Sequence, residues 1–252
     1  ETTEQLFALA KAFAEQDPDR NGQKDTYGMA ISGSGAERTI KQMFQSVDFI
    51  VRDGKVEYPW DNIGATASFL KRLYDEGIVD KDFLTDNNGE KAKQDFVNGK
   101  IGIYPTQVSW TSFAQNEYKT LKENVPDAEL IAIPLPASPA GAFIPTLTNP
   151  VQMTAAVNRA AKHPEAVMKV IEVVTSDEVQ LLSARKTARM SPLLGEEPKK
   201  QFGADVPYLQ GKHVEALFKS TVSPSPVYSI YENDGKKIGQ QAFRDYAADK
   251  VD

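Results

Sequence analysis

Oxygen-bearing side chains recur at every second position between residues 17 and 25, with a glycine at the sixth position of the run. This alternation matches the first two-thirds of an EF-hand calcium loop, because calcium binds about six to eight hard oxygens and the glycine permits a sharp turn. Gly28 stands where a complete EF-hand has a bidentate glutamate, so an Asx-rich turn without metal is the alternative. The predicted calcium ligands are the side chains of Asp17, Asp19, Asn21 and Asp25 and the backbone carbonyl of Gln23.

A second candidate site follows the short alternating stretch at residues 101–104. Its two-residue period predicts a strand, and Gly99 before it can end a helix in the left-handed conformation. The next loop carries amides, hydroxyls and an indole at the carboxyl end of that strand, where open α/β sheets bind ligands. The alternative is that the indole only fills the core. The predicted ligand-binding residues are Trp110, Gln107 and Tyr104, with Ser34 from a small-residue loop over 32–35.

The composition bounds the class of protein. A chain of 252 residues is long enough for one large domain or two modest ones, and its net charge of −6 argues against a nucleic-acid partner. The absence of cysteine excludes thiol catalysis and cysteine metal sites, and it fits an extracytoplasmic location without proving one. No run approaches the length of a membrane span.

Helical and strand periodicities predict a mixed α/β chain that must position these residues. Asp61 and the pair Thr175 and Glu178 are expected to cap helices, and Trp60 is expected to pack at a helix entry. The predicted helices cover 3–15, 37–49, 62–75, 89–98, 164–174 and 234–248, the predicted strands cover 27–31, 101–104, 130–133 and 151–157, and a hairpin covers 48–58.

Four segments in order carry a resemblance to a known family. Residues 70–83 contain Leu-Tyr-Asp-Glu-Gly at a helix end, and residues 96–110 contain Phe-x-x-Gly-Lys followed by a tryptophan. Residues 162–176 resemble the helix that follows an interlobe crossing, and 17–25 resemble a calcium loop of oligosaccharide-binding members. Together they resemble the extracellular solute-binding proteins of ABC importers, the family of maltose-binding protein and the Gram-positive oligosaccharide-binding lipoproteins.

The resemblance implies a fold and a division of the chain. The implied fold is α/β, the periplasmic-binding-protein-like two-lobed fold of type II. Family members have a first βα half-lobe before the helix on which this chain opens, so the expectation is that the N-terminal half-lobe is missing. The expected parts are 1–140 as most of the C-terminal lobe, 141–185 as the interlobe crossing with N-lobe helices, and 186–252 as a return segment with C-terminal helices.

The resemblance also implies a function. The expected protein binds a carbohydrate, in particular an oligosaccharide, and delivers it to an ABC permease in the membrane, as a monomer and not as an enzyme. Trp110 would stack on the C–H face of a sugar while polar side chains bind its hydroxyls. The expected location is extracytoplasmic, as a cell-surface lipoprotein or a periplasmic protein. With one lobe incomplete, residues 1–252 alone are expected to bind sugar weakly or not at all.

Two other function classes remain open from the residues. A secreted glycoside hydrolase needs two carboxylates across a cleft, but no local pattern selects a pair among 35 acidic residues. His163 and His213 are isolated, which argues against a triad or a zinc site. A calcium-dependent structural or adhesion module would rest on the calcium loop alone. Turnover of oligosaccharides would identify the enzyme, and calcium binding without sugar binding would identify the module.

Overall fold

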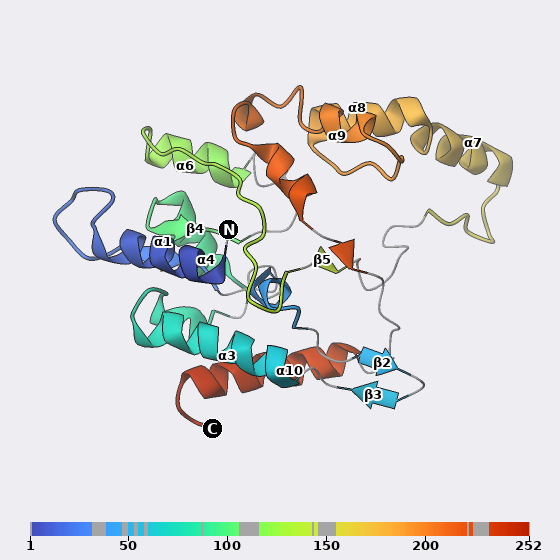
Figure 1. The fold of residues 1–252 in the computed structure, drawn as a ribbon. Helices are drawn as coiled ribbons and strands as arrows, with labels where there is room; N and C mark the ends of the chain where they lie inside the picture. The colour runs from blue at the N-terminus through green and yellow to red at the C-terminus, as the bar shows by residue number, and fades with distance from the viewer. Residues whose placement is uncertain are drawn as a thin grey trace.

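The computed structural model describes residues 2–31, 39–46, 50–52, 55–57, 60–86, 88–105, 116–142, 144–145, 155–220, 222–223 and 232–251. Helices and short strands alternate along these segments, as the mixed α/β prediction requires (Figure 1). The elements in chain order are α1 Thr3–Glu15, β1 Tyr27–Met29, β2 Ile50–Arg52, β3 Lys55–Glu57, α3 Trp60–Asp75, η1 Lys81–Leu84, α4 Glu90–Val97, β4 Ile101–Ile103, α6 Tyr118–Asn124, β5 Ile144–Pro145, α7 Pro164–Val174, α8 Asp177–Thr187, α9 Glu197–Gln201, η3 Pro207–Leu209, η4 Val214–Lys219, β6 Val222–Ser223 and α10 Glu232–Ala247.

Strands β1 and β4 form a parallel pair, with Tyr27 opposite Ile101 and Met29 opposite Ile103. The pair confirms the two strands that were predicted around the candidate ligand site. Helix α1 packs across both strands, and α4 packs against β4. Gly28 permits the close approach of α1, because a Cβ atom there would lie 2.0 Å from the carbonyl oxygen of Ala10.

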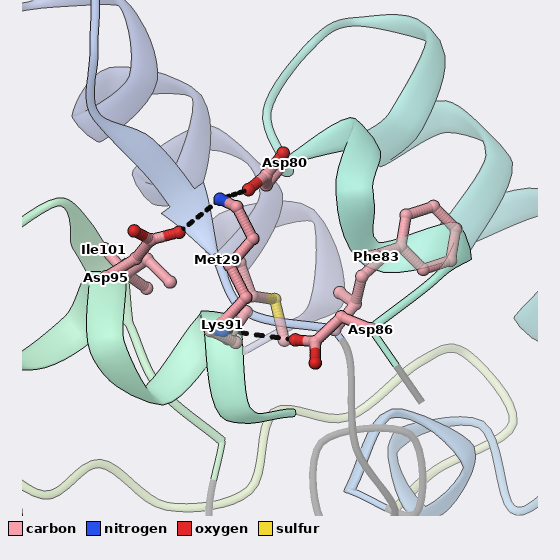
Figure 2. Close-up of a pocket in the computed structure, with 10 residues that line it drawn as sticks. Met29, Asp80, Phe83, Asp86, Lys91, Asp95 and Ile101 are labelled. Atoms are coloured by element: carbon pink, nitrogen blue, oxygen red, sulfur yellow. Dashed lines mark hydrogen bonds and ion pairs between the residues drawn. The ribbon is translucent and has the colours of Figure 1, made fainter. Parts of the chain in front are cut away.

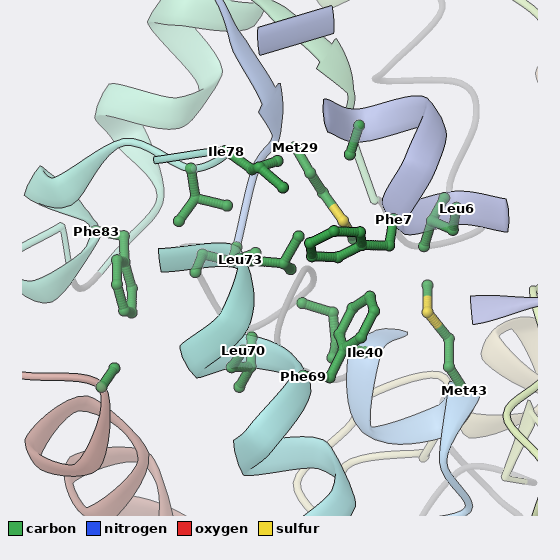
Figure 3. Packing of buried hydrophobic residues seen from close by; sticks show 14 of the residues in the cluster. Leu6, Phe7, Met29, Ile40, Met43, Phe69, Leu70, Leu73, Ile78 and Phe83 are labelled. Atoms are coloured by element: carbon green, nitrogen blue, oxygen red, sulfur yellow. The ribbon is translucent and has the colours of Figure 1, made fainter. Parts of the chain in front are cut away.

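A hydrophobic cluster, the α1–α3 cluster, packs against the β1–β4 pair (Figure 3). It joins α1, β1, the helical residues 39–43, α3 and the segment that follows α3. Phe69 holds this cluster together by aromatic contacts with Phe7 at 6.1 Å and Phe44 at 5.2 Å between ring centroids. The buried members include Leu6, Phe7, Ala10, Met29, Ile40, Met43, Phe69, Leu70, Leu73, Ile78 and Phe83.

A second cluster, the α4–α6 cluster, also contacts the pair. The partners Tyr27 and Ile101 belong to this cluster or pack against it, whereas the partners Met29 and Ile103 belong to the α1–α3 cluster or pack against it. The two clusters therefore meet along the strands. The second cluster contains Ala30, Ala92, Phe96, Val97, Ile101, Tyr118, Leu121, Ala188, Phe202, Val206 and Leu209.

Helix α3 packs against α10, and the two helices lie side by side in Figure 1. The predicted hairpin is confirmed by the antiparallel pair β2–β3, in which Arg52 lies opposite Lys55. Helix α3 begins at Trp60, so Asp61 lies in its first turn and is not the cap that was predicted. The predicted packing role of Trp60 is also wrong, because its side chain is 69 % exposed.

Three further sequence predictions differ from the structure. Ser176 caps α8 by accepting the Val179 N–H, while Thr175 ends α7, so the predicted Thr175–Glu178 capping box does not form. Residues 130–133 form no strand, although the Ala132 N–H donates to the Lys212 carbonyl at 2.8 Å. The predicted strand over 151–157 lies partly outside the described residues, and its last three residues are irregular.

Among the described segments, no helix combines the length and the apolar character that crossing a bilayer requires.

Candidate functional site

The carboxyl ends of β1 and β4 meet at one edge of the parallel pair. The Ala30 N–H donates to the Ile103 carbonyl at 3.0 Å, so the two segments are still hydrogen-bonded where the strands end. After β1 the polypeptide continues from this edge through Ile31 toward Ser34. After β4 it continues from the same edge through Pro105 toward the predicted ligand-binding loop. The carboxyl edge of parallel strands is where α/β folds bind ligands, so the topology places two predicted ligand-binding segments beside each other at their starting points.

Three of the four predicted ligand-binding residues, Ser34, Gln107 and Trp110, lie outside the described residues. The fourth, Tyr104, directly follows β4 and is half-buried. Its ring stacks on Phe96, with 4.7 Å between centroids and 28° between planes. Burial, followed by the negative charge of Glu117, raises the pKa of the Tyr104 hydroxyl, which therefore stays protonated at neutral pH.

Glu117 is a polar residue near this edge that the sequence did not single out. Its Oε1 atom pairs with Lys93 Nζ at 3.1 Å. Its Oε2 atom is buried and has no hydrogen-bond partner among the described residues. A buried carboxylate oxygen without a donor is costly, so this atom calls for a donor from outside those residues. Its position in the sequence shortly after Trp110 would have been the only sequence signal for it.

A cluster of acidic side chains surrounds Lys91 beside β1 (Figure 2). Lys91 Nζ bonds to Asp80 and to Asp95, the latter at 2.7 Å, and Asp82 lies 3.8 Å away. Burial opposes the charge on Lys91, but the two bonded carboxylates outweigh it and raise the pKa of the ammonium group. The cavity here measures only about 10 Å³, roughly the room for one water molecule, so this cluster fixes α4 beside η1 and is not a sugar site.

A larger cavity of about 250 Å³ lies between the segment 190–196, α9 and η4. Its lining is mostly apolar, with Glu196 and Lys199 as its charged members, and those two side chains pair with each other at 2.8 Å. Sugar sites combine ring faces with several convergent polar groups, which this lining does not offer. Its full lining is Met190, Ser191, Leu193, Leu194, Gly195, Glu196, Pro198, Lys199, Phe202 and Phe218.

The loop that joins α1 to β1 gathers its side chains around the amide of Asn21. The Asn21 Nδ2 group donates to Asp19 Oδ2 at 2.9 Å and to Asp25 Oδ1 at 3.1 Å. Asp17 accepts the backbone N–H groups of Asn21 at 3.1 Å and of Gly22 at 2.8 Å. Gly22 has a φ of +79°, so the glycine supplies the sharp turn for which it was singled out.

Like charges lie close together in this loop. The carboxyl groups of Asp17 and Asp19 lie close together, and their interaction lowers the pKa of Asp17 and raises the pKa of Asp19. The Asn21 amide, and then the Lys100 ammonium 3.4 Å away, lower the pKa of Asp25. Nowhere in the described segments do three Asp, Glu or His side chains gather closely enough to hold a metal ion. The acidic side chains thus converge on an amide in this arrangement.

Comparisons with known proteins identify the family through residues 1–181, which match the sequence model of the bacterial extracellular solute-binding proteins. Lipoprotein LipO of Bacillus subtilis (strain 168) is 31 % identical over 136 residues, which are 50 % of this chain and 27 % of LipO. The polygalacturonan/rhamnogalacturonan-binding protein YtcQ of the same organism is 33 % identical over 109 residues, 41 % of this chain and 22 % of YtcQ.

A third relative is the fructooligosaccharide ABC transporter substrate-binding protein FusA of Streptococcus pneumoniae serotype 4 (strain ATCC BAA-334 / TIGR4). It is 33 % identical over 117 residues, 42 % of this chain and 21 % of FusA. The matched region therefore spans between a fifth and about a quarter of each of these curated relatives.

The fold is shared with a solved structure, CpMnBP1 with mannobiose bound. The TM-score is 0.61 at 17 % sequence identity, over 99 % of this chain and 60 % of that chain. The arrangement of elements is therefore that of the two-lobed α/β binding proteins, while the division at residues 140 and 185 stays a prediction. With a family match over most of its length, the chain belongs to the bacterial extracellular solute-binding protein family.

Proposed function

We propose that this chain is part of a protein that binds an oligosaccharide and delivers it to an ABC importer. The observation that carries the proposal is the carboxyl edge of the β1–β4 pair, from which two segments rich in hydroxyl, amide and aromatic side chains depart. Two relatives are named for binding carbohydrates, and the similar solved structure holds mannobiose. Sugars are bound by ring faces and convergent polar groups, which suits these segments.

We propose distinct roles for the residues at this edge. Trp110 stacks on a sugar ring, and Gln107 and Ser34 bind hydroxyl groups. Tyr104 forms the wall behind them, because one face of its ring is already stacked on Phe96. Glu117 is not one of the residues that contact the sugar, because its unpaired oxygen is buried.

The protein binds its sugar without cleaving it. Its relatives in the family are substrate-binding proteins. Among the described residues, one group of acidic side chains pairs with Lys91, and another belongs to the α1–β1 loop. The competing class is a secreted glycoside hydrolase, in which two carboxylates flank the bound sugar. We further propose that the protein has a permease in the membrane as its partner, is extracytoplasmic and is a monomer.

Calorimetry on the full product of the reading frame tests the proposal. Mannobiose, a fructooligosaccharide and an oligogalacturonide are the ligands to use, since they represent the three carbohydrate classes named among the similar proteins. We expect saturable binding of one class and recovery of the sugar uncleaved. Residues 1–252 alone are expected to bind it more weakly, because lobe closure contributes contacts from both sides.

Two outcomes would contradict the proposal. Hydrolysis of any of the three sugars would favour the glycoside hydrolase. Failure of all three to bind a folded protein that still binds calcium would favour the structural module.

We also propose that the α1–β1 loop binds calcium and that the ion stabilises the fold without taking part in chemistry. Asp19 and Asp25 both accept from the Asn21 amide and Asp17 lies beside Asp19, which supports this because neighbouring carboxylates repel one another until a cation lies between them. To bind the ion, the three must draw closer together than they lie here. Asn21 would have to turn its Nδ2 group away and its Oδ1 inward, which breaks the 2.7 Å bond that Oδ1 accepts from the Gln23 N–H. An ion there would hold the end of α1 against the start of β1.

Thermal melts check the calcium proposal. A ligand that binds only the native state raises its stability by mass action, so millimolar calcium should raise the melting temperature above that in chelator. The Asp19→Ala variant should lose this difference. Asp127→Ala, which removes an exposed carboxylate from the loop after α6, should keep it. Equal melting temperatures of the unaltered protein in calcium and in chelator would show that the loop is a metal-free turn.

A further inference from the structure

Helix α4 presents its amino-terminal end at the carboxyl edge of the β1–β4 pair. Helix α4 packs against β4, and the turn at residues 98–100 reverses the chain between them, so the helix runs back along the strand that it precedes. Asp86, which precedes α4 (Figure 2), lines the same small cavity as Ala30 and Ile31, the two residues that follow β1. The first turn of α4 therefore borders the edge at which the proposed sugar site begins.

The amino-terminal end of a helix attracts anions when its N–H groups are unoccupied, because the partial positive charge of the helix lies there. In α4 the protein supplies the anion itself. The Ala92 N–H donates to Asp86 Oδ2 at 3.1 Å, and Glu90 adds a second carboxylate in the first turn. Little of the positive charge of this helix end therefore remains for a ligand.

A third carboxylate lies near the same edge. Burial, and then the negative charges of three carboxylates, raise the pKa of the Tyr104 hydroxyl. These carboxylates belong to Glu117, Glu90 and Asp86, in order of their effect. Because Tyr104 directly follows β4, all three act at the point where the polypeptide leaves the edge toward the predicted ligand-binding loop.

The cations that could offset these charges are engaged with carboxylates. Lys91 and Lys93 are the two cations of α4, and each is bonded to a carboxylate, at 2.7 Å for Lys91 and 3.1 Å for Lys93. The small-residue loop over 32–35 and residues 106–115 contain no charged residue in their sequence. The described side of this edge is therefore acidic, and its field repels an anionic ligand.

We propose that the sugar bound at this edge is neutral, and that the carboxylates of Asp86, Glu90 and Glu117 exclude acidic sugars such as uronides. This inference rests on the proposed function and names the class of sugar that the same site accepts. Exclusion by like charge needs no direct contact, because carboxylates about 10 Å apart still repel one another where water is partly displaced. Glu117 therefore takes part through its charge although its side chain does not reach the sugar.

Calorimetry of the full product of the reading frame with matched ligands tests this selectivity. The probes are mannobiose, a fructooligosaccharide and an oligogalacturonide, together with a derivative of the bound neutral sugar that has a carboxylate in place of one primary hydroxyl. We expect the neutral sugar to bind at least about tenfold more tightly than its carboxylate derivative at about 0.05 M salt. This ratio should shrink at about 0.5 M salt, where the Debye length is only about 4 Å.

A variant without one of the charges separates electrostatic exclusion from shape. Glu90→Gln removes a carboxylate and keeps the length of the side chain, so the ratio of the two dissociation constants should fall about threefold. Glu123→Gln is the matched control and should keep the ratio. Glu123 is exposed and lies beside the opposite end of α4, where its neighbour Asn124 donates to the Val97 carbonyl at 2.9 Å.

Three results would overturn the proposal. Binding of the oligogalacturonide or of the carboxylate derivative as tightly as the neutral sugar would leave the proposed function in place and remove the charge selection. A ratio that neither salt nor Glu90→Gln changes would assign the selectivity to the shape of the site. Failure of every sugar to bind the folded protein would remove both the proposed function and this inference.

Discussion

Replacing Gly28 with alanine is expected to destabilise the protein more than any other small substitution in β1. The added Cβ would lie 2.0 Å from the carbonyl oxygen of Ala10 and 2.7 Å from a methyl group of Ile78. The first of these is a backbone atom of α1, which cannot move aside as a side chain can. Overpacking of this kind costs about 3 kcal/mol or more, a large part of the roughly 5–15 kcal/mol that stabilises a domain. Urea unfolding measures the change in free energy of unfolding.

Gly64→Ala is the matched control for this substitution. Gly64 lies inside α3, and a Cβ atom there would meet nothing within 4 Å. Alanine is the better helix former, so this variant should be more stable by about 0.5–1 kcal/mol. Full stability of Gly28→Ala would mean that α1 does not cross β1 as closely as the structure has it.

Removal of the indole in Trp110→Ala is expected to weaken oligosaccharide binding by about 2 kcal/mol, roughly thirtyfold in Kd, with little change in stability. Trp110 stands between Ser109 and Thr111 in a polar loop, whereas a core tryptophan more often stands in an apolar run. A buried structural tryptophan would instead cost roughly 3–5 kcal/mol of stability on truncation. Calorimetry and thermal melting of the same variant in the full protein separate the two roles.

The other tryptophan of the chain supplies the control. Trp60 lies at the first turn of α3 with 69 % of its surface exposed, so Trp60→Ala should change neither affinity nor stability appreciably. A large fall in the melting temperature of Trp110→Ala, with unchanged affinity in the folded fraction, would place Trp110 in the core and the ligand site elsewhere.

Much of the local structure could be predicted because it depends on neighbouring residues. The start of α1 at Thr3, the parallel strands on either side of the candidate edge and the β2–β3 hairpin all follow from spacing and turn residues. Gly99 adopts a φ of +77° after α4, as a helix-ending glycine should. Tyr104 directly follows β4, and its stacking on Phe96 depends on packing between elements and has no local signal.

The remaining features depend on residues that are distant in sequence. The cluster at Lys91 draws its carboxylates from the cap of η1 and from α4, and their irregular spacing gave no reason to connect them. The sequence predicts helix α7, but the exposure of its apolar side chains depends on which elements pack against the helix. Helix caps were misplaced by one residue at Thr175 because Ser176 offers the same hydroxyl.

The β1–β4 register has a consequence for the order of folding. Tyr27 and Ile101 are partners although more than seventy residues separate them, and the β5–β6 pair joins residues equally far apart. The β2–β3 hairpin and the turns of α3 need only neighbouring residues, whereas each parallel pair must first close a long loop. The edge that carries the candidate site therefore forms late. A sugar added to the unfolded chain finds no binding edge, so it should slow unfolding without speeding folding.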